Sequence, residues 1–366
     1  MRKFELSVSP DYVPTWNVVD GVRELFQNSL DQQTTCPDNE MFFNYEPHTE
    51  ILTIGNKNSI LEPKTLLLGS TTKKDDNSTI GKFGEGYKLA TLVLLRLGKS
   101  ITFYNYGRRE VWTPRFVDSR RYGTKVLTFF VDHKYMWQSV PNSNLKIVVD
   151  GITNEEYEDI VASNLHLQTL EDTIETPFGT IIKDRSCKGK VFVNGLYVCT
   201  HEPYVYGYNF KPEYINIDRD RKLVSDFDLK WLSSRMWATA KSEDVVNLAS
   251  NGAADVAFVT NVGYRTSDMY DNAFNTFKLE YGEKAIPVTS QMELSSIPSG
   301  YNPIIVHNTY KELITGSTHY EVPVEEERIS PIDELVKWFE VIRPGMLSQD
   351  VETFHAIVHR LRTTYE

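Results

Sequence analysis

The sequence has little cysteine and no long apolar run. Its 366 residues include three cysteines, Cys36, Cys187 and Cys199, with no C-x-x-C spacing. That pattern is typical of reduced thiols and argues against a disulfide framework or a zinc site. No stretch approaches the roughly 18 apolar residues of a membrane helix. The N-terminal residues MRKFELSVSPDY also lack the apolar core of a signal peptide. These absences predict a cytoplasmic protein without a membrane partner.

Positive charge is also scarce. The formal net charge is −11, which disfavours nucleic acid as a partner, because such binding generally uses a basic surface. An acidic surface could instead bind a basic protein partner. Hydrophobic residues make up 40% of the chain, enough for ordinary globular cores. The length predicts two or three domains.

The first 150 residues predict an α+β sandwich, with a helical layer on one sheet. Apolar residues at helical spacing predict a helix over 15–33, and residues 55–80 have the polar composition of a loop or lid. Glycines at 81–86 open a second, buried helix that ends near residue 97. Strands are predicted at 41–45, 50–54, 100–106, 110–117 and 124–131.

Two further domains are predicted, over residues 151–249 and 250–366. The first combines a helix within 150–170, strands within 178–200 turning at Asn194-Gly195, and a helix over 226–249. The second begins as a small α/β unit and ends in two helices broken at Arg343-Pro344-Gly345. Its predicted strands are 256–260, 284–288 and 302–308, around a helix at 268–282.

Three local motifs carry the chemistry. In the first, Glu24, Asn28 and Asp31 stand at i, i+4 and i+7 and therefore share one face of the first helix. The alternative interpretation is a polar helix side that faces water.

The second motif is Thr79–Ala90, in which Gly81, Gly84 and Gly86 precede a helix. Glycines let the backbone approach an anion, and free N–H groups at a helix start point at phosphates. A Rossmann site needs a strand directly before the glycines, whereas here a polar segment precedes them. The Gly-Lys-Ser/Thr of a Walker A loop is also absent.

The third motif is Gly123-Thr124, which opens a strand, and the lid contains Leu68-Gly69-Ser70-Thr71-Thr72-Lys73. In this order, the motifs over about residues 15–135 resemble the GHKL ATPase family of gyrase B, the 90-kDa heat-shock chaperones, histidine kinases and MutL. The segment from Leu68 to Ala90 is most similar to MORC-, MutL- and chaperone-type members. A phage-encoded relative also fits.

The resemblance implies a Bergerat-type ATP-binding sandwich and Mg²⁺-dependent hydrolysis of ATP to ADP and phosphate, coupled to a conformational switch. Glu24 matches the family residue that activates water, and Asn28 matches the ligand of Mg²⁺. Gly81, Gly84 and Gly86 would hold the phosphates, Lys88 would add charge there, and Thr124 would contact adenine. The remaining nucleotide contacts that we expect are Asp31, Asn56, Thr72, Lys73, Phe83, Glu85 and Tyr87.

One departure concerns the adenine-binding Asp of the family, which follows the hairpin. The matching stretch here is residues 54–59, which contain no Asp. The side-chain carbonyl of Asn56 could accept the same hydrogen bond, with its NH₂ group pointing elsewhere. The departure leaves an alternative open: a degenerate GHKL fold that acts as a non-enzymatic protein-interaction module or inhibitor.

The second domain resembles the transducer, a β-α-β domain that sends a basic residue to the γ-phosphate in several family members. Arg221 or Lys222, in the run 215–222, is our candidate, and an exposed charged loop is the alternative. No phospho-accepting His precedes the ATP segment, which disfavours a histidine kinase, and the length disfavours a complete type II topoisomerase. A homodimer is left open.

Overall fold

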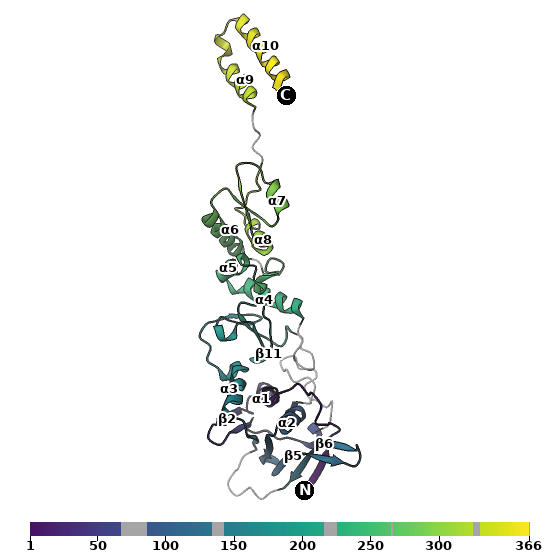
Figure 1. Ribbon diagram of the computed structural model, residues 1–366. Helices are drawn as coiled ribbons and strands as arrows, with labels where there is room; N and C mark the ends of the chain where they lie inside the picture. Colours follow the sequence, from purple (N-terminus) through teal and green to yellow (C-terminus); the bar gives the residue numbers. More distant parts are fainter. Residues whose placement is uncertain (67–85, 134–142, 216–224, 265, 325–329, 366) are drawn as a thin grey trace. The chain divides into compact units, whose positions relative to one another are not determined.

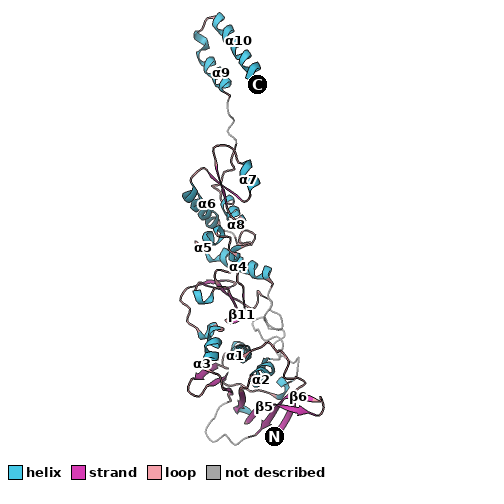
Figure 2. Cartoon of the chain, in the orientation of Figure 1, coloured by secondary structure: helices cyan, strands magenta, loops and turns pink. Residues whose placement is uncertain are grey.

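The computed structural model describes residues 1–66, 86–133, 143–215, 225–264, 266–324 and 330–365 (Figure 1). The chain divides into two compact units, Met1–Met269 and Tyr270–Glu366. Both units combine helices with strands, as Figure 2 shows by colour. The fold is therefore mixed α and β, whereas the boundaries expected at residues 150 and 249 stay predictions.

The first unit contains a seven-stranded sheet in the order β1-β6-β5-β4-β7-β3-β2. Each adjacent pair in it is antiparallel. Residues alternate between the two faces of each strand, and one face carries the buried positions. The strands are β1 (Arg2–Glu5), β2 (Met41–Glu46), β3 (Ile51–Asn56), β4 (Ser100–Asn105), β5 (Glu110–Ser119), β6 (Thr124–Asp132) and β7 (Leu145–Asp150).

Helices α1 (Val18–Thr35) and α2 (Gly86–Arg96) pack on this sheet and against each other. They share one core with the inward strand residues, including Leu25, Leu92 and Phe103. Two 3₁₀ turns, η1 (Pro63–Leu66) and η2 (Tyr106–Arg108), lie in its connections. The described part of this region has the sheet and helical layer that the sequence predicts.

Helix α1 begins later than residue 15 because Asn17 caps it. The Asn17 side chain accepts a hydrogen bond from the Asp20 amide at 3.0 Å, and the Asp20 carboxylate accepts one from the Asn17 amide at 3.0 Å. This reciprocal capping box satisfies two amide groups that a helix start leaves without partners.

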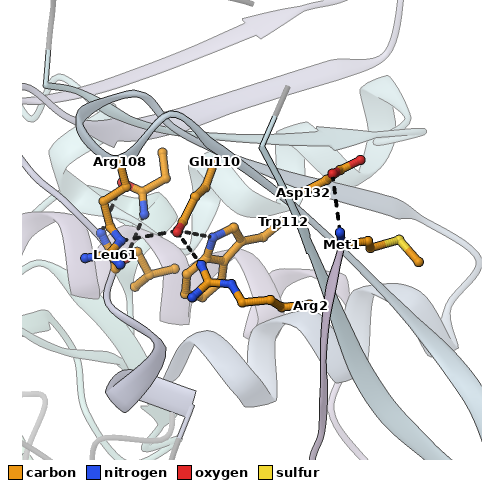
Figure 3. A network of polar contacts seen from close by, with 8 residues as sticks. Met1, Arg2, Leu61, Arg108, Glu110, Trp112 and Asp132 are labelled. Atoms are coloured by element: carbon orange, nitrogen blue, oxygen red, sulfur yellow. Dashed lines mark hydrogen bonds and ion pairs between the residues drawn. The ribbon is translucent and has the colours of Figure 1, made fainter. Parts of the chain in front are cut away.

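A buried carboxylate ties the edge strand β1 to the sheet (Figure 3). Glu110, at the start of β5, accepts hydrogen bonds from Arg2 of β1, from Arg108 at 3.3 Å and from the Trp112 indole at 3.0 Å. Because its side chain is 1% exposed, these donors compensate for the lost hydration of the charge.

A second polar network lies at the C-terminal end of α2, where Arg96 acts as a clamp. The guanidinium of Arg96 donates to the carbonyls of Pro10, Tyr12, Val13 and Trp16, at 2.9–3.1 Å. Cations favour the C-terminal end of a helix, and here the same charge fixes the segment between β1 and α1.

The rest of the first unit is built on a five-stranded sheet in the order β11-β10-β12-β9-β8, in which β10 and β12 run parallel. Asn194 and Gly195 both have positive φ and turn β10 into β11, as the sequence predicts. Its elements are α3 (Asn154–Ala162), η3 (Leu165–Leu167), β8 (Thr173–Thr176), β9 (Gly179–Ile182), η4 (Arg185–Cys187), β10 (Lys190–Val193), β11 (Leu196–Thr200), β12 (Gly207–Phe210), α4 (Asp226–Ala240), α5 (Asp244–Ser250) and η5 (Ala254–Val256).

Two predictions in this region are wrong. The helix expected over 226–249 is broken at Lys241, whose φ of 50° is left-handed. The strand expected at 256–260 is instead a 3₁₀ turn followed by irregular turns. Val256, Val259 and Val262 are buried at a spacing of three, so a helical period outweighs their strand propensity.

The second unit contains two parallel strands, β13 and β14, and the two C-terminal helices that the sequence predicts, with the break at Arg343–Gly345. Its elements are α6 (Ser267–Tyr281, which begins in the first unit), β13 (Ala285–Val288), α7 (Gln291–Ser296), β14 (Asn302–Ile305), α8 (Asn308–Thr315), α9 (Pro331–Ile342), η6 (Arg343–Gly345) and α10 (Ser348–Tyr365). No helix in the described ranges combines the length and apolarity needed to cross a bilayer.

Candidate functional site

The polar face of α1 is buried. Glu24 is 2% exposed and Asp31 is 1% exposed, while Asn28 is half-buried. The alternative of a helix side facing water is therefore wrong. Glu24 lies 3.8 Å from the guanidinium of Arg23, which is buried beside it. Buried charged groups are uncommon on a helix face and occur both in structural ion pairs and in functional sites, so this face is a candidate site.

The start of α2 lies directly on that face. A Cβ atom at Gly86 would stand 2.5 Å from Asn28 Nδ2 and 3.0 Å from Glu24 Oε2. Glycine is therefore the residue that allows this approach. The contact joins the first two motifs of the sequence, which lie about sixty residues apart. It also directs the amide end of an 11-residue helix toward the two side chains.

The amide of Asn28 has a fixed orientation. Its Nδ2 donates to the Glu24 carbonyl at 2.7 Å, which turns Oδ1 away from the helix backbone. This oxygen lies beside the N-terminus of α2. Such a position suits a hard cation such as Mg²⁺, which takes one or two protein oxygens together with phosphate.

Asn56, the last residue of β3, is hydrogen-bonded to the backbone of α1. Its Nδ2 donates to the carbonyls of Ser29 at 2.8 Å and Asn39 at 2.9 Å. These two bonds fix which amide atom is nitrogen. Its Oδ1 is buried and accepts no hydrogen bond from the described residues. Next to it, Gly55 permits the close approach of β7, because a Cβ there would lie 1.9 Å from the Leu145 carbonyl oxygen.

Tyr87 and Lys88 follow Gly86 into the first turn of α2. Burial raises the pKa of the Tyr87 hydroxyl, and the carboxylate of Asp31 raises it further. Lys88 is 1% exposed, so the alternative of a solvated helix lysine is wrong.

Two residues of this region were not identified from the sequence. Gln27 is buried with both amide atoms lacking partners among the described residues, and the Ser29 hydroxyl lacks one too. Gln27 stands three residues after Glu24 and four before Asp31, so helical spacing could have placed it on the same face. Nothing in the local pattern marks Ser29.

Thr124 does not belong to this cluster. Gly123, with a φ of 65°, ends the exposed turn between β5 and β6, and Thr124 begins β6, where it pairs with Ser119. Four strand spacings, about 19 Å, separate β6 from β3. The strand registers also put Asn56 at the opposite end of the sheet. The expectation that Thr124 contacts the same ligand as Asn56 is therefore corrected by the strand order.

The other predicted site residues lie outside the described residues. They are Thr72, Lys73, Gly81, Phe83, Gly84, Glu85, Arg221 and Lys222.

The described residues fit a nucleotide with a bound Mg²⁺. Asn56 offers a buried acceptor for a base, the start of α2 offers amide donors for phosphates, and Asn28 offers an oxygen for the cation. Glu24 adds a carboxylate beside them.

Comparisons with known proteins give two matches in Mycoplasma pneumoniae. The family model described as the Mycoplasma pneumoniae MPN635 N-terminal domain matches residues 155–242. An uncharacterized protein of that organism is 26% identical over 240 residues, which cover 62% of this chain and 92% of the relative. The family match falls on the segment from α3 to α4.

Among solved structures, the ATPase region of topoisomerase II from Saccharomyces cerevisiae is similar to this chain, with a TM-score of 0.28 and 10% identity. The match covers 50% of this chain and 61% of that one. This chain therefore spans less than two thirds of the yeast structure, and we draw nothing further from so distant a similarity.

Proposed function

We propose that the chain is a GHKL-type ATPase that binds ATP with Mg²⁺ between α1, β3 and the start of α2, and hydrolyses it to ADP and phosphate. One observation carries this proposal: Glu24 and Asn28 meet Gly86 at the first residue of α2. Glu24 and Asn28 belong to one sequence motif and Gly86 to another, and only the family resemblance connected the two motifs. Their contact is a separate, spatial argument for one site.

In this proposal Glu24 takes a proton from the attacking water. A carboxylate beside the phosphates can act as a general base, and its burial keeps bulk water from competing. Bound Mg²⁺ would neutralise phosphate charge. Asn28 would hold the cation through Oδ1, and the amides at the start of α2 would orient the phosphates.

Asn56 is the proposed determinant of base choice. Its NH₂ group already donates to two carbonyls, so the side chain can offer a ligand only the buried Oδ1, which is an acceptor. The exocyclic amine of adenine supplies a donor. The corresponding position of guanine is a carbonyl, which would face Oδ1 as a second acceptor. We expect adenine nucleotides to bind more tightly than guanine nucleotides for this reason.

The proposal extends to segments outside this cluster. Gly81 and Gly84 would cradle the phosphates, and Thr72, Lys73, Phe83 and Glu85 would make further contacts with the nucleotide. Arg221 or Lys222 would reach the γ-phosphate from a transducer-like domain over residues 151–249. Hydrolysis would then reset a switch between open and closed states of a cytoplasmic protein.

The test is calorimetric titration of ATP and a non-hydrolysable analogue, with Mg²⁺, into wild type, Asn28→Ala and the control Asn275→Ala. Asn275 is an exposed asparagine on α6, far along the chain from the site. We expect binding to wild type and the control, and a loss of Mg²⁺-dependent affinity in Asn28→Ala. Absence of adenine-nucleotide binding to wild type at millimolar concentration would sink the proposal.

A second candidate is a non-enzymatic interaction module that keeps this fold. It is favoured by Asn56, a neutral residue where the family usually has Asp, and by the net charge of −11. Nucleotide hydrolysis by wild type that is lost in Glu24→Ala would exclude it.

A further inference from the structure

Helices α9 and α10 form a C-terminal hairpin, and the small interface between them is called the seam below. The rings of Phe339 and Phe354 stack with their centroids 3.6 Å apart, and Val358 is buried beside them. Asp333 and Arg362 form an ion pair at 2.6 Å. The stack and the ion pair fix α9 and α10 as antiparallel neighbours.

One flank of this hairpin is apolar and exposed. On α9, Leu335, Trp338 and Val341 recur every third residue and are 38%, 58% and 78% exposed. With 3.6 residues per turn, Leu335 and Trp338 project to the side of Phe339 opposite Asp333. On α10, Ile357 projects to the same flank, opposite Arg362, and is 42% exposed. The ion pair and this apolar flank therefore lie on opposite sides of the seam.

The hairpin exposes six large apolar side chains, because Met346 and Leu347 of the connection, which are 39% and 75% exposed, add to those of the flank. Large contiguous apolar patches on a protein surface mark interaction sites. A standard dimer interface buries about 800 Å² per partner, around a core of such side chains. Two helices of 12 and 18 residues bury little core of their own, so a covering layer would add substantially to their stability.

The charge of the hairpin favours a second copy over other partners. Residues 331–365 contain five acidic and four basic residues, in a chain whose net charge is −11. A nearly neutral segment has no basic excess with which to bind nucleic acid or an anionic lipid surface. It also lets two acidic chains meet here with the least repulsion.

We propose that the chain dimerises through this flank, with the apolar side of each hairpin packed on that of a second copy to form a four-helix bundle. Such an interface is self-complementary: Trp338 of each copy packs on the other hairpin. The proposal is independent of nucleotide binding, because none of its residues belongs to the site on α1.

The experiment is sedimentation equilibrium of the full chain over a wide range of concentration. We expect wild type to approach twice its mass of 42.1 kDa. The double variant Leu335→Glu/Trp338→Glu should raise the dimer dissociation constant more than about tenfold, because aromatic anchors dominate interface energies. Its circular dichroism should match wild type, since both side chains are partly exposed in the single copy.

The matched control is Leu279→Glu, on α6, where the leucine is 90% exposed. It introduces one charge at an apolar surface position outside the hairpin and should leave the dimer intact. A wild type that stays monomeric at every concentration would overturn the proposal, as would a double variant that dimerises as tightly as wild type.

Discussion

Two buried polar regions of the first unit differ in how fully their hydrogen bonds are made. At the start of β5, Glu110 accepts from Arg2, Arg108 and Trp112 (Figure 3). Around α1, in contrast, Gln27 and the Asn56 oxygen are buried without partners among the described residues. An unsatisfied buried polar group costs about 1–3 kcal/mol. The first region therefore stabilises the fold, whereas the second makes sense as a surface that a ligand completes.

The largest effect is expected from a substitution of Glu24, on the α1 side of this comparison. We expect Glu24→Gln to lower ATP turnover by about 10²–10⁴-fold, the usual contribution of a general base, while nucleotide affinity changes little. Phosphate release and calorimetry measure the two quantities. Glu40→Gln, whose side chain is 64% exposed, is the control and should hydrolyse like wild type. Equal turnover in the two variants would remove Glu24 from the reaction.

Glu110→Gln should lower the stability of the fold and leave the nucleotide site unchanged. Removing the charge that Arg2 and Arg108 share should lower the free energy of unfolding by about 2–3 kcal/mol, the scale of hydrogen bonds to charged groups. Nucleotide affinity should be unaffected. Denaturant titration measures the first effect, with Glu158→Gln on the exposed side of α3 as the control. A variant as stable as wild type would show that the network does not hold β1.

Gln27→Met should stabilise the nucleotide-free protein. Methionine has nearly the same shape and removes two buried polar atoms that lack partners among the described residues, so we expect a gain of about 1 kcal/mol. The stabilisation that Mg²⁺-ATP adds should become smaller than in wild type. Thermal unfolding with and without nucleotide measures both. Gln32→Met, at a half-buried position on the same helix, should change neither. A destabilised Gln27→Met variant would contradict this reading of the α1 face.

The smallest effect concerns Glu293, a fully partnered carboxylate at the surface. Hydrogen bonds from Lys311 and Thr289 lower its pKa to about 2. Its stabilising contribution should be complete above its ordinary pKa of 4.5 and be lost as the pH falls toward 2. Glu293→Gln should therefore be less stable than wild type at neutral pH and approach it near pH 2. A stability difference that does not vary with pH would contradict the assignment.

Much of the fold could be predicted from local patterns, because periodicity and turn residues act over a few positions. The hairpin turn at Asn194-Gly195 and the helix break at Arg343–Gly345 are such cases. The strand prediction at 256–260 was wrong because the strand propensity of the valines in 256–262 conflicts with their helical spacing in a short run.

The candidate site was predictable only in part. The helix face of Glu24 and Asn28 follows from spacing within one segment. Its burial, and the approach of Gly86, depend on how α1 packs against α2, some sixty residues later. The position of Thr124 depends on strand order, which no local motif contains.

The clamp formed by Arg96 gives α2 a mechanical role. The helix is about 16 Å long, and Gly86 at one end contacts Glu24 and Asn28 while Arg96 at the other holds four backbone carbonyls of residues 10–16. A helix is stiff over this length. A displacement of the N-terminal segment along the axis of α2 should therefore be transmitted to Gly86. Substitutions in residues 10–16 should therefore alter the geometry around Asn28 without contacting it.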